Sequence, residues 1–278
     1  MSPKKTKVVV KLTRRDFLTV AAAAVGSVIA AEVLTTGPLS PFSSLQQEQT
    51  EKEIVEPGHE GTSSTYHWGM VIDLDKCIGC EYCQRACSAT NDVSADKPWN
   101  LVIHEKTTHG NTFFLTRPCL HCQNAPCVEV CPVKATYHRE DGLVVMDYQR
   151  CIGCRYCEVA CPYDARKFNW DARDDTNAYI PTWGIAEVPR RARGVVEKCT
   201  FCIQRIDEGL KRGLEPGIDR EATPACVNIC PVGARSFGNL KDPNSPISQV
   251  VASNPVIRLR DDLGTEASVY YIPPKEGL

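Results

Sequence analysis

Apolar side chains are unevenly distributed over the first part of the chain. Residues 17–31 (FLTVAAAAVGSVIAA) carry no charge, but 15 residues are too few for an ordinary membrane-spanning helix. Residues 35–65 are rich in Ser, Thr, Pro, Gly, Gln and Glu, a composition that predicts a flexible tether. In residues 68–74 (WGMVIDL) large apolar side chains take every second position, which predicts a half-buried strand. Folded sequence is therefore expected to begin near Tyr66.

The N-terminus has the pattern of an export signal. Residues 1–31 contain six Lys or Arg against one Asp, and the positive charges precede the apolar run. Within them Arg14 and Arg15 are followed by Asp-Phe-Leu, which resembles the twin-arginine signal for proteins exported after folding. A cytosolic amphipathic helix is the alternative, but no apolar stripe repeats there at helical spacing. We expect a signal peptide over residues 1–31, cleaved near its end or kept as an anchor, and a flexible linker over residues 32–65.

The rest of the chain contains two internal repeats. Residues 73–87 (DLDKCIGCEYCQRAC) match residues 147–161 (DYQRCIGCRYCEVAC) at 9 of 15 positions. Residues 127–135 (CVEVCPVKA) match residues 226–234 (CVNICPVGA) at six of nine positions. The chain is thus expected to hold two copies of a unit with two cysteine groups.

Composition narrows the class of protein. The 278 residues are 42% hydrophobic and 24% charged, which is ordinary for a folded protein and excludes wholesale disorder. A net charge of −2 excludes a strongly basic nucleic-acid-binding protein. No stretch after residue 65 reaches 18 apolar residues, so any membrane contact of the mature protein is expected to need a partner. The 16 cysteines exceed normal usage, although the chain is too long for a small disulfide scaffold.

Every cysteine falls in one of four groups of four. The groups are Cys77, Cys80, Cys83 and Cys87; Cys119, Cys122, Cys127 and Cys131; Cys151, Cys154, Cys157 and Cys161; and Cys199, Cys202, Cys226 and Cys230. The first and third groups have the spacing C-x2-C-x2-C-x3-C of bacterial ferredoxins, in which three thiolates bind one cubane and the fourth binds a neighbouring cluster. The second group widens the middle gap to four residues and the fourth group to 23. A proline follows the last cysteine of all groups except the first, where Ser88 stands.

Three other uses of these cysteines fit less well. Disulfides would strain C-x2-C pairs that recur so closely, and zinc usually takes two short pairs with a long spacer. A radical enzyme of the S-adenosylmethionine type would need C-x3-C-x2-C, which none of the groups contains. Four 4Fe–4S clusters with four thiolates each account for all 16 cysteines and leave none over.

Several residues beside the cysteines are candidates for contact with a cluster. Gly79 and Gly153 suit a sharply turning loop that offers backbone N–H groups to sulfur. Ile78 and Ile152 are expected to shield the clusters from water.

Aromatic and basic residues also recur at fixed places in the groups. Tyr82 and Tyr156 occupy the same repeat position and are expected to pack over the clusters. Lys76, Arg150 and Lys198 each precede a first cysteine and are candidates for raising cluster potentials. The alternative for all three cations is a solvated surface charge.

With these motifs the sequence resembles the four-cluster iron–sulfur subunits of the dimethyl sulfoxide reductase and polysulfide reductase superfamily. The resemblance extends from Trp68 to about Ile272. Besides the CIGCxYC runs it includes residues 198–202 (KCTFC), 224–226 (PAC) and 264–271 (GTEASVYY). Members with their own twin-arginine signal resemble the accessory subunits of periplasmic nitrite reduction, tetrathionate reduction and sulfur respiration.

The resemblance implies a fold and a domain organisation. An α+β architecture is expected, with little regular structure and two ferredoxin-like dicluster modules, one nested in the other. The four-cluster domain would cover residues 66–250, with an outer module of residues 66–105 and 190–250 and an inner module of residues 106–189. Residues 251–278 would form a C-terminal extension.

The resemblance also implies which cysteines share a cluster, and in each set the fourth cysteine comes from another group. Cluster 1 would have Cys77, Cys80, Cys83 and Cys230; cluster 2, Cys119, Cys122, Cys127 and Cys161; cluster 3, Cys151, Cys154, Cys157 and Cys131; cluster 4, Cys199, Cys202, Cys226 and Cys87. The internal repeats alone do not give these sets, because they relate the first group to the third.

The implied function is single-electron transfer without catalysis. The expected partners are a polytopic quinone-binding membrane subunit of the polysulfide reductase type and a catalytic molybdopterin subunit or multihaem cytochrome, with no nucleic acid and no small-molecule substrate. The subunit would lie in the periplasm or at the outer face of the cytoplasmic membrane, held peripherally by its membrane partner. Two alternatives remain open at this point: a scaffold protein with purely structural clusters or zinc, and a stand-alone soluble polyferredoxin.

Overall fold

The structure of the chain is a computed structural model that describes residues 64–275. The expected signal peptide and nearly all of the expected linker lie outside the described residues. In the part that the structure describes, no helix is long and apolar enough to cross a membrane. The secondary structure there consists of short strands and helices joined by many turns, as expected for a loop-rich α+β protein.

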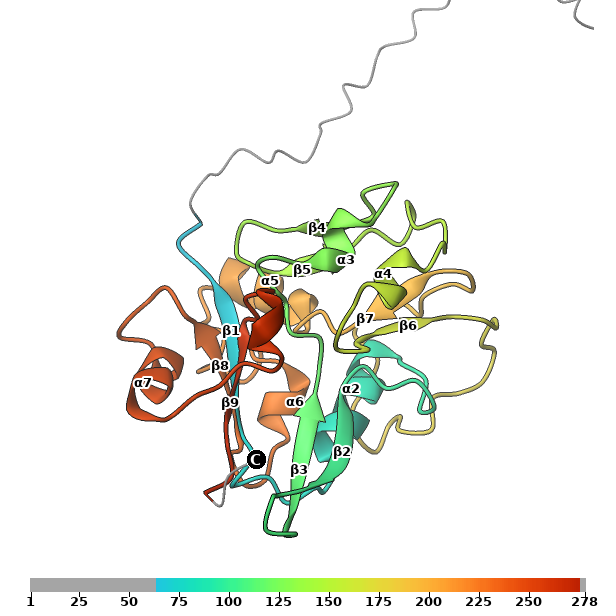
Figure 1. The fold of residues 1–278 in the computed structure, drawn as a ribbon. Coiled ribbons are helices and arrows are strands. Elements are labelled where there is room, and N and C mark those ends of the chain that lie inside the picture. Colours follow the sequence, from blue (N-terminus) through green and yellow to red (C-terminus); the bar gives the residue numbers. More distant parts are fainter. Residues whose placement is uncertain (1–63, 276–278) are drawn as a thin grey trace, which may run out of the picture. The chain divides into compact units, whose positions relative to one another are not determined.

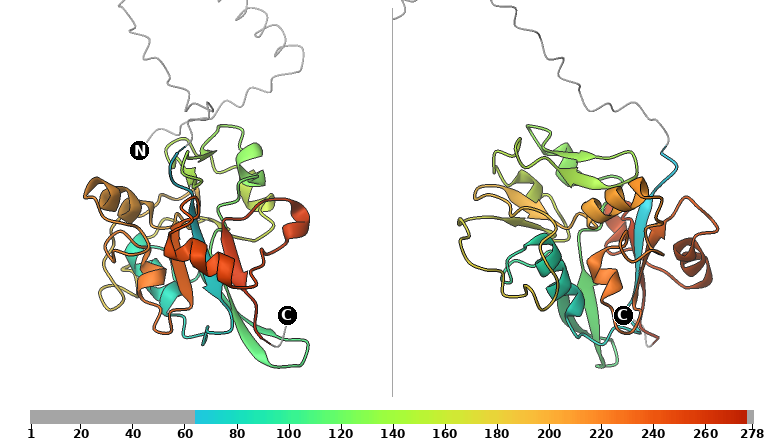
Figure 2. Two further views of the ribbon diagram at one scale, coloured as in Figure 1. Left: turned by 90° about the vertical axis from the view of Figure 1, so that its left-hand side faces the viewer. Right: turned by 180° about the vertical axis from the view of Figure 1, so that it is seen from behind.

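A three-stranded sheet contains the strand expected at residues 68–74. Its order is β8 (Arg235–Asn239), β1 (Trp68–Asp73) and β9 (Val269–Ile272), with β8 antiparallel and β9 parallel to β1. The expectation of a half-buried strand is wrong, because all six residues of β1 are buried. β1 is the central strand, and α7 (Pro246–Ser253) packs near one side of the sheet (Figures 1 and 2). The side chains between the large apolar ones are therefore covered as well.

Three two-stranded antiparallel sheets complete the strand structure. They are β2 (Leu101–Lys106) with β3 (Thr112–Arg117), β4 (Thr136–His138) with β5 (Val144–Met146), and β6 (Arg166–Phe168) with β7 (Val196–Lys198). In each, a strand that follows the last cysteine of one group pairs with a strand that precedes the first cysteine of the next. β8 follows the fourth group and pairs with β1, which precedes the first, so the same relation joins the last group to the first. The β4–β5 and β2–β3 hairpins lie at opposite ends of the described part (Figures 1 and 2).

Four short helices begin at corresponding places in the four cysteine groups. They are α2 (Tyr82–Asn91), α3 (Pro126–Glu129), α4 (Tyr156–Val159) and α6 (Ala225–Asn228). The second residue of each helix is the third cysteine of its group. The long gap of the fourth group contains a further helix, α5 (Ile203–Lys211), and a 3-10 turn, η1 (Asp261–Leu263), precedes β9.

Residues 251–275, expected as part of a C-terminal extension, contribute to the core. Val269 and Tyr271 of β9 are fully buried. The backbone carbonyls of Thr265 and Glu266 accept hydrogen bonds from Asn124 at 3.0 Å and Gln123 at 2.9 Å, so this segment lies against the second cysteine group. The β2–β3 and β6–β7 sheets likewise join residues on both sides of the expected module boundaries.

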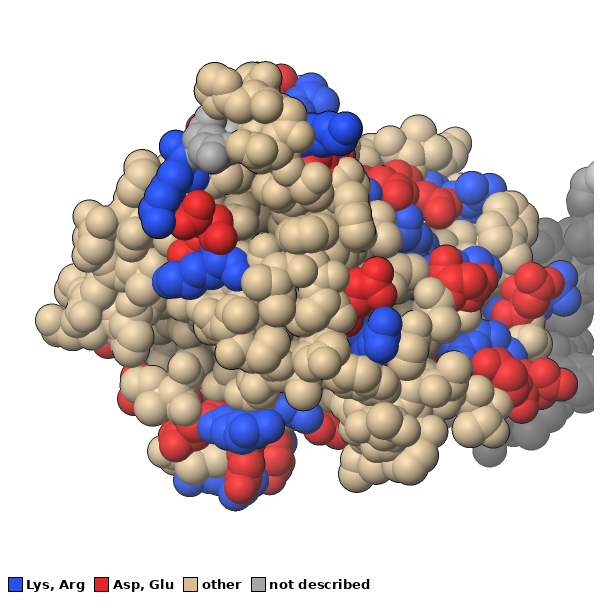
Figure 3. All heavy atoms as spheres, turned by 90° about the horizontal axis from the view of Figure 1, so that it is seen from below, with Lys and Arg blue, Asp and Glu red and all other residues tan. Residues whose placement is uncertain are grey.

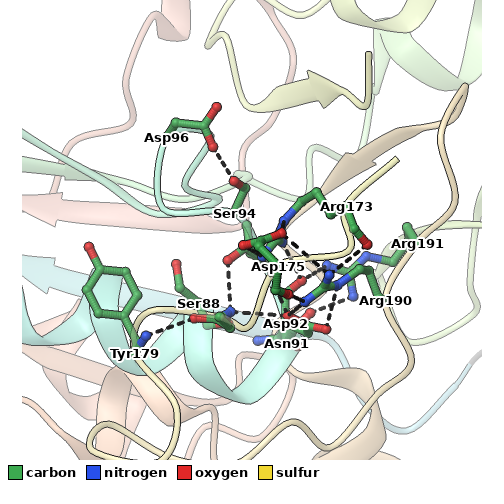
Figure 4. Close-up of polar contacts among 12 residues, drawn as sticks. Ser88, Asn91, Asp92, Ser94, Asp96, Arg173, Asp175, Tyr179, Arg190 and Arg191 are labelled. Carbon is green, nitrogen blue, oxygen red and sulfur yellow. Dashed lines mark hydrogen bonds and ion pairs between the residues drawn. The ribbon is translucent and has the colours of Figure 1, made fainter. Parts of the chain in front are cut away.

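The connection over residues 169–195 has no regular strand or helix and is attached to the end of α2 by polar contacts (Figure 4). Asp92 accepts hydrogen bonds from Arg190 at 2.9 and 3.1 Å and from Asn177 at 3.2 Å. Burial alone would raise the pKa of Asp92, but these donors outweigh it and lower the pKa. Arg191 pairs with Glu197 at 2.8 Å, and both side chains are nearly inaccessible. Charged side chains thus fix the long connection where an apolar core is lacking.

Replacing Asp92 is expected to loosen this connection. Asp92→Ala removes the carboxylate that accepts from the Arg190 guanidinium and the Asn177 amide, while both donors keep backbone carbonyls as acceptors, so it should cost roughly 1–3 kcal/mol of unfolding free energy. Asp175→Ala is the matched control, because Asp175 also pairs with Arg190 but its side chain is 56% exposed. Thermal unfolding and the rate of proteolytic cleavage within residues 169–195 would both report the difference. Equal effects of the two substitutions would contradict the assignment of the attachment to Asp92.

Candidate metal centres

Two pockets are lined by four cysteines each. The first is lined by Cys77, Cys80 and Cys83 of the first group and Cys230 of the fourth, with Ile72, Ile78 and Val102 around them. The second is lined by Cys151, Cys154 and Cys157 of the third group and Cys131 of the second, with Ile152, Met146 and Val196. In both pockets three thiols of one loop meet the last thiol of a distant group.

Seven of the other eight cysteines are buried, and Cys161 is partly buried. Burial, followed by the neighbouring thiols of Cys199, Cys202 and Cys226, raises the pKa of Cys87 well above its ordinary value. Burial raises the pKa of Cys122 to about 12, with further contributions from Cys119, Cys127 and Cys161. These two neighbourhoods again combine cysteines from different groups. The assignment of each thiol to a cluster stays a prediction.

The electrostatics of these thiols suit an iron–sulfur cluster. Burial disfavours the thiolate form, so an enclosed set of four thiolates is costly without a metal that takes up their charge. Within residues 64–275, no three His, Cys, Asp or Glu side chains are close enough together to hold one metal ion. A cubane does not require such a set, because each of its four thiolates binds a different iron. Four thiols around a small, mainly apolar pocket therefore fit the donor set of a 4Fe–4S cluster.

The glycines and isoleucines proposed from the sequence line the two pockets. Gly79 and Gly153 have φ of 69° and 70°, which places them in the left-handed turn that glycine favours. The Gly79 amide donates to Cys77, which opposes the rise that burial causes in the pKa of that thiol. Ile78 and Ile152 are 56% and 64% exposed, so they stand at the mouths of the pockets rather than inside them.

The two tyrosines do not line these pockets. Tyr82 is 39% exposed, and its ring lies 4.7 Å from that of Trp183 in the long connection. Tyr156 is 63% exposed at the start of α4. The lining positions are instead taken by the preceding residues, Glu81 and Arg155, which have left-handed backbone conformations. Packing of the tyrosines over the clusters stays a prediction.

The three cations that precede first cysteines have different surroundings. Lys76 and Arg150 are exposed, and Lys76 pairs with Asp73 at 3.0 Å. Lys198 is fully buried, and its Nζ donates to the backbone carbonyls of Val144 and of Cys199, the latter at 2.9 Å. A solvated charge therefore describes the first two residues but not Lys198.

A donor at the end of α2 was not predicted from the sequence. Asn91 is buried, and its Nδ2 lies 3.8 Å from the sulfur of Cys87 and 3.6 Å from that of Cys202. It donates to the Cys87 carbonyl as well, at 3.1 Å. Nothing in the repeats marks this position, because the first group continues into a longer helix than the others.

Two buried arginines were also not predicted. Arg166 donates to the sulfur of Cys127 at 3.0 Å, and the charge of Arg235 acts on Cys83 and Cys226. The sequence does carry a signal for them, because Ala-Arg-x-Phe follows the last cysteine of both the third and the fourth group at the same distance.

The family comparisons agree with this chemistry. A family model described as a 4Fe–4S dicluster domain matches residues 76–135 and 150–234, and another of the same description matches residues 110–177. The chain is 43% identical to a putative iron–sulfur subunit of the dimethyl sulfoxide reductase of Halobacterium salinarum, over 74% of this chain and 79% of that protein. It is 36% identical to a subunit of the tetrathionate reductase of Salmonella typhimurium, over 77% and 75%. It is also 36% identical to one of the polypeptides of the polysulfide reductase of Wolinella succinogenes, over 76% and 96%.

A methyl group at Gly153 is expected to disturb its cysteine loop. A Cβ there would lie 2.2 Å from the backbone oxygen of Gly194, and φ is unfavourable for other residues. Gly153→Ala should lower both the iron content and the thermal midpoint. Gly194→Ala is the matched control, because its φ is also positive at 87° but its Cβ would meet nothing within 4 Å. The control should cost only about 1 kcal/mol. Normal iron content and stability in Gly153→Ala would argue against a rigid loop.

Proposed function

This chain belongs to the iron–sulfur subunits of the dimethyl sulfoxide, polysulfide and tetrathionate type of reductase, and from that premise we propose that its clusters form a single line in the order 1, 4, 2, 3. It is an electron-transfer subunit with four 4Fe–4S clusters rather than the catalytic subunit of its complex. When bound, each cluster accepts and returns one electron. The protein's own part is to fix the spacing, shielding and charge along the line.

The contacts between thiols of different sets support this order. Cys87 of set 4 lies near Cys83 of set 1, which joins those two clusters. In the same way Cys157 of set 3 lies near Cys127 of set 2. The observation that carries the proposed order is that the charges of Cys199 in set 4 and Cys119 in set 2 interact, since this proximity would join the two pairs into one path.

The exposure of the cysteines gives the line two ends. All four cysteines of set 4 are buried, and so are three of the four in set 2. Sets 1 and 3 each line a pocket at the surface, and Cys154 of set 3 is exposed. Electrons would therefore enter at one terminal cluster and leave at the other, while the two inner clusters are kept from solvent.

The same contacts support nested modules. Sets 1 and 4 draw their cysteines from residues 77–87 and 199–230, whereas sets 2 and 3 draw theirs from residues 119–161. The outer module would then enclose the inner one along the sequence. The β6–β7 sheet and the neighbouring thiols of Cys199 and Cys119 would hold the two modules together.

We propose that partner subunits dock at the two terminal clusters. Relatives named as components of polysulfide and tetrathionate reductases support a quinone-binding membrane subunit and a catalytic subunit as those partners. Figure 3 shows an area without Lys, Arg, Asp or Glu between scattered charged residues on the face seen from below. Depletion of charge is a feature of the cores of protein interfaces.

The ligand sets can be tested by counting iron in paired substitutions. Cys87→Ala with Cys202→Ala removes two ligands of one proposed set and should lower iron from about 16 to about 12 atoms per chain. Cys87→Ala with Cys83→Ala removes one ligand from each of two sets and should leave about 8. Anaerobic iron and sulfide analysis gives the counts. Electron paramagnetic resonance during a reductive titration gives the number of redox-active clusters remaining.

The two double variants distinguish the proposed ligand sets from sets that follow the four cysteine groups. If each cysteine group bound its own cluster, the second double variant would lose one cluster and the first would lose two, which is the reverse of the outcome expected here. Serine variants, which keep a weaker oxygen ligand, replace any alanine variant that does not accumulate. Redox-silent iron in the unaltered protein would reject electron transfer itself.

We also propose that the twin-arginine signal at residues 13–18 directs export to the periplasm. Arg14→Lys combined with Arg15→Lys keeps the charge but should leave the precursor in the cytoplasmic fraction. Lys4→Gln combined with Lys5→Gln removes two charges, spares the arginine pair and should leave most of the export intact. Cell fractionation with immunodetection compares the two. Undiminished export of the double-lysine variant would reject this route.

A further inference from the structure

Arg166 is buried among the cysteines of the inner module. It is the first residue of β6 and only 1% exposed. Its Nη2 donates to the sulfur of Cys127 at 3.0 Å, while Nη1 lies 3.1 Å from both the Thr136 hydroxyl and the Met146 sulfur. Its charge acts on Cys157 as well. One guanidinium therefore lies beside a proposed ligand of cluster 2 and a proposed ligand of cluster 3.

Arg235 has the corresponding place in the outer module. It is the first residue of β8 and 5% exposed, and like Arg166 it stands five positions after the last cysteine of its group. It lines the pocket of the proposed cluster 1 beside Cys83, and its charge also acts on Cys226, a proposed ligand of cluster 4. Its Nη2 donates to Asn100 Oδ1 at 2.9 Å, and its Nη1 lies 3.5 Å from a methionine sulfur, that of Met70.

No carboxylate balances either charge. Among residues 64–275, neither arginine forms an ion pair with Asp or Glu, whereas the buried Arg191 pairs with Glu197. A buried cation without a partner is strongly unfavourable. The compensating negative charge would therefore be that of the cysteine thiolates that hold the clusters, since Arg166 donates to the Cys127 sulfur and Arg235 lines the pocket that contains Cys83.

We propose that Arg166 and Arg235 are positioning residues that place one fixed positive charge between the two clusters of each module and raise the reduction potentials of both. This inference rests on the ligand sets proposed above. A nearby cation stabilises the added electron on whichever of the two clusters holds it. Because one charge lies beside both clusters of a module, it raises both reduction potentials. An electron on either cluster can therefore still pass to the other.

The experiment is a reductive titration of single variants of the full chain. Arg166→Gln should lower two of the four potentials by about 59 mV each, which is tenfold in the reduction equilibrium of a one-electron couple. Arg235→Gln should lower the other two. Arg166→Lys keeps the charge and should recover most of the shift.

Two controls separate charge from packing. Thr136→Val removes a hydrogen-bond acceptor of Arg166 and leaves its charge, so it should alter stability with little effect on potentials. Arg139→Gln removes a half-buried arginine that pairs with Asp141 and Asp207 and touches no thiol in the described residues, so the four potentials should stay unchanged. Unchanged potentials in both Gln variants, with four clusters present, would overturn the inference and leave the arginines as packing residues.

A second measurement needs no substitution, in case the Gln variants do not assemble. In the unaltered protein labelled with 15N-arginine, pulsed electron paramagnetic resonance should detect a 15N coupling to a reduced cluster, because Arg166 donates directly to a sulfur. Arg166→Lys should abolish the coupling at the clusters of the inner module and leave that of Arg235 in the outer module. No arginine coupling at any cluster would overturn the inference. Failure of the proposed ligand sets is a different result, because it would show in the iron counts of the cysteine pairs.

Discussion

The enclosure of sixteen cysteine thiols is the constraint on which the rest of this structure depends. Nine of the cysteines are buried and only Cys154 is exposed. Burial raises the pKa of thiols such as Cys87 and Cys226, yet a cluster needs thiolates, so their buried state is favourable only together with iron. The protein adds what the metal alone does not supply: backbone amides such as that of Gly79, the amide of Asn91 and the guanidinium of Arg166. Metal–thiolate bonds thus supply part of the stabilisation that an apolar core supplies in other proteins.

That constraint also accounts for the small sheets. Each sheet joins the strand leaving one cysteine group to the strand entering another, and β8 with β1 joins the fourth group to the first. In two of these pairings, β8 with β1 and β4 with β5, the last cysteine of one group lies close to the first three cysteines of another, as for Cys230 beside Cys77 and Cys131 beside Cys151. Strands of three residues are long enough to align the thiols, because the bonds from these thiols to iron are stronger than the hydrogen bonds of the sheets.

Charge is distributed according to depth. Near the surface, Lys76 and Arg155 pair with carboxylates that solvent also screens. Among the buried cysteines, Lys198 donates to backbone carbonyls, Arg166 donates to the sulfur of Cys127, and Arg235 lines one of the two cysteine pockets. Arg191 of the long connection forms a buried ion pair with Glu197 of β7, and the connection lies against the end of α2. Electrostatic interactions therefore organise both the metal centres and the segment attached to α2.

The sequence by itself determined the chemistry: cysteine spacing indicated four cubanes, and the repeated glycines indicated the tight turns found at Gly79 and Gly153. It also located the strand at β1, but not its complete burial, which follows from its central place between β8 and β9 and from the packing of other elements, such as α7, against the sheet. Spacing gave no reason to distinguish Lys198 from Lys76, because both precede a first cysteine and only the surrounding chain buries one of them. Only the tertiary structure decided which distant thiols are neighbours and which arginines lie beside them. These contacts join segments up to about 150 residues apart, so no local sequence pattern indicates them.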